Sequence, residues 1–389
     1  MFNYSKDKLE ALGANVTTEE IKQQPELWME VIENYRENEE QIQHFIDQIQ
    51  SKHDHLRVIF AGAGTSAFVG EAVQPYLSKV HENSSITFEA IPTTEIVAKP
   101  RNYFFKDQPT LLVSFARSGN SPESLKTVEL AEAIIDDLYH LSITCNPEGK
   151  LATQANTANH LLILQPERSN DKGFAMTSSY TCMLLTSLLI FDQNDLATKQ
   201  AYIEQMVAMA EDIFGRYEQI EEIVQLDFER VVYLGAGSLF GLAHEAQLKL
   251  LELTAGQIAT LYETPLGFRH GPKSFINDKT LVLLFNSNDD YADLYDSDLL
   301  NEVYHDQIAQ EVLSLSVGKN EKHEAKQFVL DEKFKALPDA YLVLPYVIWA
   351  QIFAVMTAIK VGNTPDTPSA SGTVNRVVKG VILHPFENN

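Results

Sequence analysis

The chain has 389 residues, of which 44% are hydrophobic and 22% charged, and this composition is typical of a globular protein with a large buried core. It carries 54 acidic against 30 basic residues, which gives a formal net charge of −24. Because such a charge repels polyanions, the composition argues against binding nucleic acid or an anionic membrane surface. An anionic small substrate would need a positive site that is built locally.

The first 55 residues stand outside the repeat that organises the rest of the chain. Thr17 and Glu20 have the spacing of a capping box, which predicts a helix start at Thr17. Residues 26–51 are predicted to form an amphipathic helix. Its apolar side chains fall largely on one face, and they are Leu27, Val31, Ile32, Tyr35, Ile42, Phe45, Ile46 and Ile49. We expect residues 1–50 to form a helical extension that packs on the first sheet or on a partner subunit.

The segment 111–124, LLVSFARSGNSPES, combines a buried strand, a tight polar turn and the start of a helix at Pro122. We call its residues 118–121 the serine loop. Such a turn directs several backbone N–H groups and hydroxyls at one point, at the positive end of the helix dipole. The pattern therefore suggests a phosphate site, although serines that only cap the helix would explain the same residues.

A strand, glycine loop and helix start at 58–70, VIFAGAGTSAFVG, recur 173 residues later as VVYLGAGSLFGLA. The corresponding segments are 58–70 with 231–243, 110–115 with 280–285, 141–145 with 313–317, and 161–166 with 341–345. We therefore predict an α/β fold that uses a parallel sheet, covered by helices on both faces, twice. In such sheets ligands bind beyond the carboxyl ends of the strands, where the glycine loops and the serine loop belong.

The loops of the two halves differ in what they can bind. Neither glycine loop has the third glycine of a dinucleotide-binding fingerprint, and no acidic residue is evident at the end of the next strand, so dinucleotide binding is disfavoured. The counterpart of the serine loop, LLFNSNDD at 283–290, keeps the strand but has an acidic turn that is ill suited to phosphate. Residues 195–226 are predicted to form a helical link between the halves.

Two later segments and the two cysteines bear on the fold and on the location of the protein. Residues 341–359 carry no charge, but Pro345 divides them. The part before the proline predicts a short buried strand, and the part after it a core or subunit-interface helix, too short to span a membrane. Residues 363–380, rich in proline, serine and glycine, form either a flexible tail or a loop folded over a site. Cys145 and Cys182 lack metal-ligand spacing, and the N-terminus has no apolar signal segment, so we expect a cytoplasmic protein.

A charged face is predicted on the helix that follows the second glycine loop. Glu245, Lys249 and Glu252 are spaced four and three residues apart and lie on one face among leucines. An exposed stripe of salt bridges has the same spacing, but the leucines and the position just after the glycine loop favour a functional site. His270 lies in a predicted loop, and a lone histidine is more often structural.

The serine loop, the doubled glycine unit and the E-x-x-x-K-x-x-E…HGP run resemble the sugar isomerase (SIS) family, in the arrangement of the isomerase half of glucosamine-6-phosphate synthase. The resemblance covers residues 40–389. The segments QQPELW, SFARSGNSPES and RHGPKSF are similar to AgaS-type proteins, which are described as galactosamine-6-phosphate deaminases or tagatose-6-phosphate ketose/aldose isomerases. The resemblance implies two tandem SIS domains of the flavodoxin-like three-layer form, at 51–200 and 201–362, followed by an active-site loop and tail at 363–389.

The resemblance also implies which residues hold the substrate. The phosphate-binding residues would be Ser66, Ser118, Gly119, Asn120 and Ser121, with further substrate contacts from Gly64 and Thr65. Arg117 stands where the synthase has an uncharged amide, and we assign it to the same phosphate site as an added positive charge.

Catalysis is implied for the second half and for the C-terminal segment. Glu252 falls on the carboxylate that moves a proton between C1 and C2, and Glu245 and Lys249 fall on its charged neighbours. His270 falls on the histidine that opens the sugar ring, and Lys379 on the lysine that closes over the site. The interval from Glu252 to His270 is two residues longer than in the synthase, which leaves the substrate in question rather than the fold.

The function that the resemblance implies is an amino sugar phosphate isomerase/deaminase, which converts galactosamine 6-phosphate to tagatose 6-phosphate and ammonia without a metal or an organic cofactor. A ketose/aldose isomerase and a deglycase acting on phosphorylated sugar-amine adducts are alternatives within the enzymes. A non-catalytic phosphosugar sensor is the alternative of another class. We expect a homodimer or homotetramer with the site shared between subunits. The epimer of the sugar and the release of ammonia stay open.

Overall fold

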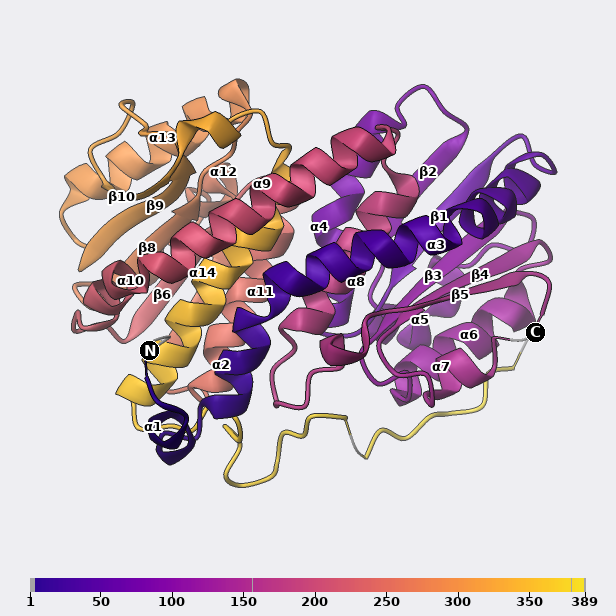
Figure 1. The fold of residues 1–389 in the computed structure, drawn as a ribbon, viewed down its shortest axis with the longest axis horizontal. Coiled ribbons are helices and arrows are strands. Elements are labelled where there is room, and N and C mark those ends of the chain that lie inside the picture. Colours follow the sequence, from indigo (N-terminus) through magenta and orange to yellow (C-terminus); the bar gives the residue numbers. More distant parts are fainter. Residues whose placement is uncertain (1–3, 156, 379, 388–389) are drawn as a thin grey trace. The chain divides into compact units, whose positions relative to one another are not determined.

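The computed structural model describes residues 4–155, 157–378 and 380–387, and they form two compact units (Figure 1). The first-sheet unit comprises Glu26–Lys172, Ser178–Leu196 and the chain from Gly372 onward. The second-sheet unit comprises the chain up to Pro25, Gly173–Thr177 and Ala197–Ser371. Each unit is therefore assembled from separate stretches of the chain.

The first-sheet unit is built around a parallel sheet of five strands in the order β2-β1-β3-β4-β5. The strands are β1 (Leu56–Ala61), β2 (Ile86–Ala90), β3 (Thr110–Ala116), β4 (Leu138–Thr144) and β5 (His160–Leu164). The helices are α3 (Gln24–Gln50), α4 (Thr65–Val80), α5 (Thr93–Ala98), η1 (Pro100–Asn102), α6 (Pro122–Ile134), α7 (Lys150–Thr153), η2 (Glu167–Ser169) and α8 (Ser178–Phe191). The strand order reverses between β1 and β3, and such reversals are where ligands bind.

The second-sheet unit repeats this strand order as β7-β6-β8-β9-β10, again with all strands parallel. The strands are β6 (Arg230–Leu234), β7 (Ala259–Glu263), β8 (Thr280–Phe285), β9 (Glu311–Val317) and β10 (Lys326–Leu330). The helices are α1 (Lys6–Ala11), α2 (Asn15–Lys22), α9 (Leu196–Gly215), α10 (Tyr217–Val224), α11 (Ser238–Leu253), α12 (Pro265–Phe268), η3 (Pro272–Phe275), α13 (Asp290–Asp306), η4 (Glu332–Phe334) and α14 (Asp339–Lys360). The predicted α/β fold with two parallel, helix-flanked sheets is confirmed.

Both faces of each sheet are buried, because successive side chains of a strand point to opposite faces. In the first sheet, Ile59 packs in an apolar cluster with side chains of α5 and α6. Its neighbour Phe60 points the other way, where its ring lies 5.8 Å from that of Phe115 and 5.7 Å from that of Phe191 in α8. This two-sided burial explains why the central strands are apolar without alternation.

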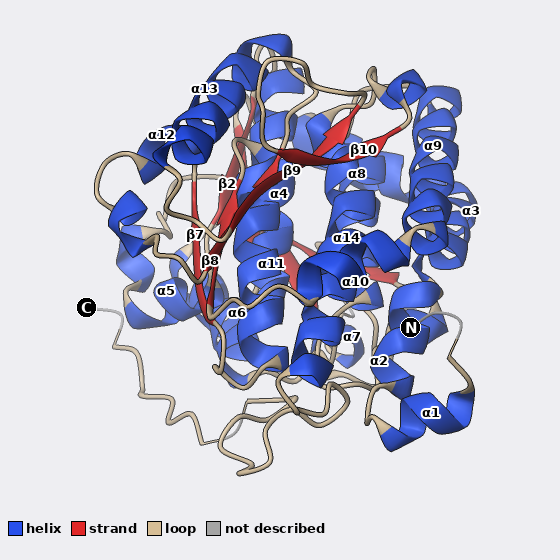
Figure 2. Cartoon of the chain, turned by 90° about the vertical axis from the view of Figure 1, so that its left-hand side faces the viewer, coloured by secondary structure: helices blue, strands red, loops and turns tan. Residues whose placement is uncertain are grey.

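The second sheet is covered in the same manner. Val232 and Leu284 belong to a cluster that includes Phe268 of α12 and side chains of α13. On the opposite face the ring of Phe285 lies 6.1 Å from that of Tyr346 in α14. Figure 2 shows β8 and β9 with α12 and α13 on one side and α11 on the other.

The strand predicted before Pro345 is wrong, and so is the pairing of 161–166 with 341–345. Residues 341–345 lie in α14, which runs unbroken from Asp339 to Lys360, and the fifth strand of the second sheet is β10. A proline inside a helix costs about 3 kcal/mol. Burial of apolar side chains around it outweighs this cost, since the four residues before Pro345 are all fully buried.

Among the described residues, α14 alone is long and apolar enough, by length and composition, to cross a membrane. Inside the protein, however, 94% of its most apolar window is buried. The burial agrees with the prediction of a core helix. The amphipathic helix predicted at 26–51 is confirmed as α3, and the helical region predicted at 195–226 is confirmed as α9 and α10.

Three strands, β2, β7 and β10, have no counterpart among the predicted elements. Each lies at the edge of its sheet. Their sequences, ITFEA, ATLYE and KQFVL, mix polar with apolar residues, and each has exposed or half-buried positions. An edge strand does not need two apolar faces, so the apolar runs that identify the central strands are missing here.

The predicted capping box at Thr17 is wrong. Thr17 lies inside α2, which begins at Asn15. The carboxylate of Asp366 accepts the backbone N–H of Val16 at 3.0 Å and that of Thr17 at 2.8 Å, together with the Thr17 hydroxyl at 2.7 Å. Glu20 instead accepts the backbone N–H of Gly173 at 3.1 Å. A residue near the other end of the chain therefore caps α2.

We predict that Asp366→Ala destabilises the second-sheet unit by about 1–2 kcal/mol, because it removes the cap of α2. The measurement is urea unfolding followed by far-ultraviolet circular dichroism. Asp298→Ala, at an exposed position of α13, is the control and should leave the midpoint nearly unchanged. Equal midpoints for the two variants would show that the cap contributes nothing.

A pair of histidines in the first sheet has a distinct electrostatic environment. His140 on β4 and His160 on β5 have ring centroids 5.1 Å apart, and the His160 ring nitrogen Nε2 lies 2.8 Å from the hydroxyl of Ser142. Burial lowers the pKa of His140 to about 4, with a smaller effect from His160, and burial also lowers the pKa of His160 to about 4. Both rings are therefore neutral in the folded protein near neutral pH.

We predict that this pair contributes to acid unfolding. Below about pH 6.5 the unfolded chain takes up protons that the folded pair resists, so the stability is complete above pH 6.5 and falls toward pH 4. The double variant His140→Asn, His160→Asn should lose less stability than the parent between about pH 7.5 and about pH 5. Urea midpoints measured at both pH values check this, with His305→Asn, an exposed position, as control. Parallel pH dependences of parent and double variant would contradict the prediction.

Candidate active site

The serine loop begins where β3 ends and leads directly into α6. Gly119 has a φ of 66°, a conformation that favours glycine. A Cβ on Gly119 would also lie 3.3 Å from the Cα of Gly149, so the loop passes close to a neighbouring segment. The turn between β3 and α6 is thus tight for both conformational and steric reasons.

A second loop, residues 146–150 after β4, braces the serine loop. The side-chain amide of Asn146 donates to the carbonyl oxygen of Ser118 at 3.0 Å. The backbone N–H of Lys150 donates to the side-chain oxygen of Asn120 at 3.1 Å. A Cβ on Gly149 would lie only 2.4 Å from the Ser118 oxygen. These bonds hold the serine loop in one shape before any ligand binds.

The hydroxyls of the loop are not used to cap α6. Ser121 is the N-cap residue, but its side chain makes no capping hydrogen bond and donates to the carboxylate of Glu123 at 2.8 Å. Ser118 is half-buried, and its hydroxyl accepts the backbone N–H of Asn120 at 3.3 Å. Without a capping side chain, the first N–H groups of α6 remain available to an anion.

The first glycine loop lies at the same edge of the sheet. Strands β1 and β3 are adjacent and parallel, with Ala61 opposite Ser114, so both loops leave the sheet at neighbouring positions. Gly64 has a φ of 55° and precedes α4, in whose first turn Thr65 and Ser66 are buried. The candidate phosphate-binding residues therefore follow the two strands between which the strand order reverses.

Arg117 is the last residue before the serine loop. It is buried, with 6% of its surface exposed. Its guanidinium nitrogen Nη2 donates to the carbonyl oxygen of Arg376 at 2.7 Å. The C-terminal segment of the first-sheet unit thus meets the end of β3 at this residue.

In the second-sheet unit, the charged face of α11 is not an exposed stripe. The side chains of Glu245 and Lys249 are 0% and 1% exposed, and that of Glu252 is 24% exposed. The Lys249 ammonium lies 2.7 Å from a Glu252 oxygen and 3.6 Å from a Glu245 oxygen. Because an exposed salt-bridge stripe would leave all three side chains in water, this alternative is overturned. One lysine is held between two carboxylates, and Glu252 alone of the three retains solvent access.

The start of α11 depends on a glycine turn like that of α4. A Cβ on Gly235 would lie 2.3 Å from the carbonyl oxygen of Leu239, and Gly237 has a φ of 55°. The turn fixes where α11 begins. The positions of Glu245, Lys249 and Glu252 on one face then follow from helical periodicity.

His270 lies in the turn between α12 and η3, and it is exposed. A single carboxylate, that of Glu302 on α13, holds both sides of this turn. It accepts from Arg269 Nε at 2.6 Å and pairs with the Lys273 ammonium. The hydrogen bonds from Lys273 and Arg269 keep the pKa of Glu302 below its usual value. Among the described residues, no hydrogen bond or ion pair joins the His270 imidazole to the charged face of α11.

Lys379, the remaining predicted catalytic residue, lies outside the described residues. Two groups of supporting residues were missed by the sequence reasoning. The loop 146–150 directly follows a predicted strand, so the rule about carboxyl ends could have identified it. Glu302 gives no local signal, because its partners lie about 30 residues away in the chain.

The counterpart of the serine loop in the second-sheet unit is acidic, as predicted. After β8, the side-chain amide of Asn286 donates to Asp293 at 2.7 Å, and the backbone N–H of Ser287 donates to Asp296 at 3.1 Å. Burial raises the pKa of Asp296 to about 7, and nearby carboxylates add to the shift. A cavity of about 250 Å³ lies here. The acidic turn lines this cavity, and further carboxylates and three lysines line it too, Lys319, Lys322 and Lys335.

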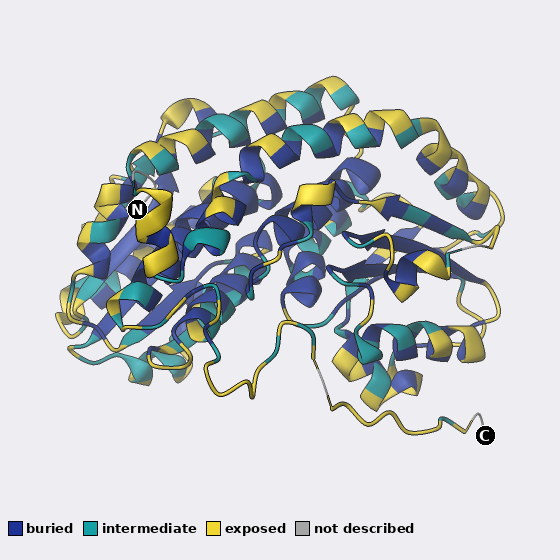
Figure 3. Ribbon diagram, turned by 60° about the horizontal axis from the view of Figure 1, so that its bottom comes forward, coloured by how far each residue is buried: buried dark blue, intermediate teal, exposed yellow. Residues whose placement is uncertain are grey.

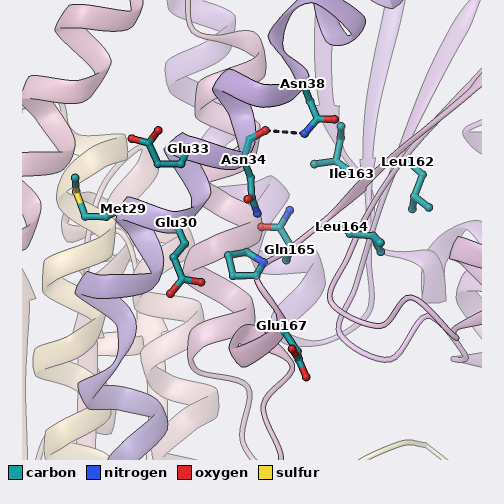
Figure 4. A pocket seen from close by; sticks show the side chains of 11 residues that line it. Met29, Glu30, Glu33, Asn34, Asn38, Leu162, Ile163, Leu164, Gln165 and Glu167 are labelled. Atoms are coloured by element: carbon teal, nitrogen blue, oxygen red, sulfur yellow. Dashed lines mark hydrogen bonds between the residues drawn. The ribbon is translucent and has the colours of Figure 1, made fainter.

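A larger cavity, of about 780 Å³, lies in the first-sheet unit, between α3 and the segment 162–167 at the edge strand β5 (Figure 4). Glu30, Glu33 and Glu167 give its lining an acidic character. None of the predicted site residues lines it. Its size alone does not make it the active site, because it lies at the sheet's edge strand and away from the strand-order reversal.

One family model and several known proteins are similar to this chain. The SIS domain model matches residues 52–191. The D-galactosamine-6-phosphate deaminase AgaS of Shewanella sp. strain ANA-3 is 43% identical, over 98% of this chain and 95% of that protein. A Clostridium novyi structure, provisionally described as a tagatose-6-phosphate ketose/aldose isomerase, is 46% identical over 99% of both chains, with a TM-score of 0.93.

The tagatose-6-phosphate ketose/aldose isomerase structure from Escherichia coli is 37% identical, covers 95% of this chain and 96% of its own, and has a TM-score of 0.86. In each of these relatives the similarity covers nearly the whole of this chain, and therefore both sheets. The chain belongs to the AgaS family of SIS-domain proteins.

Proposed function

We propose that the protein is an amino sugar phosphate deaminase/isomerase that converts D-galactosamine 6-phosphate and water to tagatose 6-phosphate and ammonia. The single observation that carries the proposal is the charged face of α11, where the Lys249 ammonium lies 2.7 Å from a partly exposed Glu252 carboxylate and beside the buried Glu245. The AgaS relatives, which are named for the deaminase reaction, support this assignment of substrate.

The reaction needs a group that removes a proton from the carbon next to a carbonyl group and returns a proton to the carbonyl carbon. After ring opening, for which His270 is the proposed acid and base, the substrate is an aldehyde at C1 with an amine at C2. Glu252 removes the proton from C2, which gives an enaminol, and returns a proton to C1. The product is an imine at C2. Water adds to this imine, and ammonia leaves as the ketone forms.

Lys249 has two roles in this scheme. Its ammonium fixes the Glu252 carboxylate by a charge-assisted hydrogen bond. It also stabilises negative charge that develops on the substrate oxygen during proton transfer, an effect that strengthens where water is excluded. The Glu245 carboxylate, 3.6 Å from the ammonium, partly balances the lysine charge from the buried side.

Phosphate binding is proposed for the first-sheet unit. The donors are the N–H groups at the start of α6 and the hydroxyls of Ser118, Ser121 and Ser66. Because the loop 146–150 already braces the serine loop, little ordering is needed when the phosphate binds. The repeated strand order further supports two tandem SIS domains, at 51–200 and 201–362, with the tail at 363–389.

The assembly and the location of the protein stay predictions. We propose a homodimer or homotetramer in which a neighbouring subunit contributes to the site, and a cytoplasmic location. A sensor that only binds the sugar phosphate is disfavoured, because it would not need a buried ion group beside the solvent-accessible Glu252.

A second candidate is a plain ketose/aldose isomerase of tagatose 6-phosphate. It is favoured by the E. coli structure of that description, and it would use the same proton transfer between C1 and C2. Assays of ammonia and ketose formation with galactosamine 6-phosphate, glucosamine 6-phosphate and tagatose 6-phosphate distinguish the two. Ammonia from the galacto substrate identifies the deaminase, and turnover of tagatose 6-phosphate alone identifies the isomerase.

We predict that Glu252→Gln lowers kcat by about 100-fold to 10,000-fold, the usual range for loss of a general acid or base. The uncharged amide keeps the shape of the side chain, so binding of the phosphosugar, measured by calorimetry, should persist. Glu222→Gln, at an exposed position of α10, is the matched control with normal turnover. Normal turnover in Glu252→Gln would disprove the assignment.

We predict that Ser118→Ala and Ser121→Ala each weaken binding of inorganic phosphate by about tenfold, because each removes a hydrogen bond to a charged group. Inhibition by inorganic phosphate measures the effect, and KM for the phosphosugar should rise in parallel while kcat changes less. Ser51→Ala, at the exposed position that follows α3, is the control. Unchanged phosphate inhibition in both loop variants would place the phosphate elsewhere.

A further inference from the structure

One contact of the Arg117 guanidinium joins it to the main chain of a distant segment. Its guanidinium donates to a main-chain oxygen, that of Arg376, at 2.7 Å. The two residues are separated by 259 positions in the sequence. Arg117 is buried, and it lies between the last residue of β3 and the serine loop. Arg117 therefore attaches a distant segment to the strand end that carries the serine loop.

Arg376 is held from its side chain as well as from its main chain. Its guanidinium donates to the carbonyl oxygen of Asp171. Asp171 is itself fixed, because it is fully buried and its carboxylate accepts the backbone N–H groups of Ser178 at 3.0 Å and Ser179 at 2.9 Å, at the start of α8. Arg376 is thus fastened at two points of the first-sheet unit.

The described part of the C-terminal segment is irregular in structure. It contains no helix or strand among its described residues, and most of it is exposed (Figure 3). Val374, Val378 and Ile382 are 57%, 53% and 78% exposed, so burial of apolar surface does not fix this part of the chain. Phe386 packs against the α5 and α6 cluster, beneath the guanidinium of Arg101. The described residues between these two attachments are mostly exposed.

We infer that Arg117 is a positioning residue, which fastens the C-terminal segment to the end of β3, and that it is not a direct phosphate ligand. The segment is thereby placed beside the serine loop, and a second guanidinium, that of Arg376, is brought to the same region of an otherwise strongly acidic protein. The inference rests on the proposed function only in treating the serine loop as the phosphate site.

Trypsin cleavage after Arg376 tests the attachment directly. The protease must take the Arg376 side chain into its specificity pocket and attack the Arg376 carbonyl, and these are the two groups held by Asp171 and Arg117. Arg117→Lys keeps the positive charge but not the geometry of the guanidinium, and Arg117→Gln removes both. In each variant we expect cleavage of the bond after Arg376 to be about tenfold faster or more, as loss of a charged hydrogen bond implies.

Arg168→Gln is the matched control, because its guanidinium pairs with Glu26 and Glu30 of α3. It should leave the cleavage rate unchanged. Mass spectrometry separates cleavage after Arg376 from cleavage at other sites, and circular dichroism confirms that each variant is folded. If Arg117→Gln does not fold, Arg117→Lys carries the test. Cleavage as slow in a folded Arg117 variant as in the parent overturns the inference.

The affinity for inorganic phosphate distinguishes a positioning role of Arg117 from a role as a direct phosphate ligand. A positioning residue predicts that Arg117→Lys binds inorganic phosphate within about twofold of the parent, and that kcat falls more than KM rises. A direct ligand predicts weaker phosphate binding with unchanged cleavage after Arg376, which would overturn the inference. Since proteolysis needs no turnover, an inactive protein would contradict the proposed function without affecting this test.

Discussion

Helices α4 and α11 both depend on one steric constraint, the close approach of helix backbone to the end of the preceding strand. At Gly62 and at Gly235 a side chain would strike main-chain atoms of the following helix, at 2.4 Å and 2.3 Å. Only glycine permits this approach. It places Ser66 in the first turn of α4, and it sets the start of α11 and hence the direction of its charged face. The same turn thus precedes the helix of the proposed phosphate site in one unit and the helix of the proposed acid-base residues in the other.

The charged face of α11 is a feature that stability alone does not explain. Removing an ion from water costs several kcal/mol, and a buried ion pair is seldom more stable than apolar side chains of similar size. Glu245 and Lys249 nevertheless lie almost completely out of solvent. Their burial gives Glu252 a fixed partner in a region of low dielectric, where electrostatic effects on a reacting group are strongest. A stability cost retained beside a partly exposed carboxylate is typical of a functional site.

The sequence predicts those parts of the fold that local patterns control. Apolar runs identify the central strands, the glycine loops identify the two turns, and periodicity identifies α3 and the face of α11. Edge strands such as β10 are half exposed and lack that pattern, and Pro345 suggests a break that burial overrides. The cap of α2 by Asp366 and the clamp of the His270 turn by Glu302 join residues far apart in sequence, so no local pattern contains them. The resemblance to a known family indicated the site residues, but not that Arg117 contacts the C-terminal segment.

The cap that Asp366 provides has a consequence for synthesis of the protein. A ribosome releases the chain in order, and domains begin to form as their residues emerge. All strands of the first sheet lie between Leu56 and Leu164, so this sheet can assemble while the second is still being made. Helix α2 is among the first segments to emerge, yet it has no cap until residue 366 is available. Completion of the second-sheet unit therefore waits for residue 366, and α2, one of the first helices to be translated, is among the last to be secured.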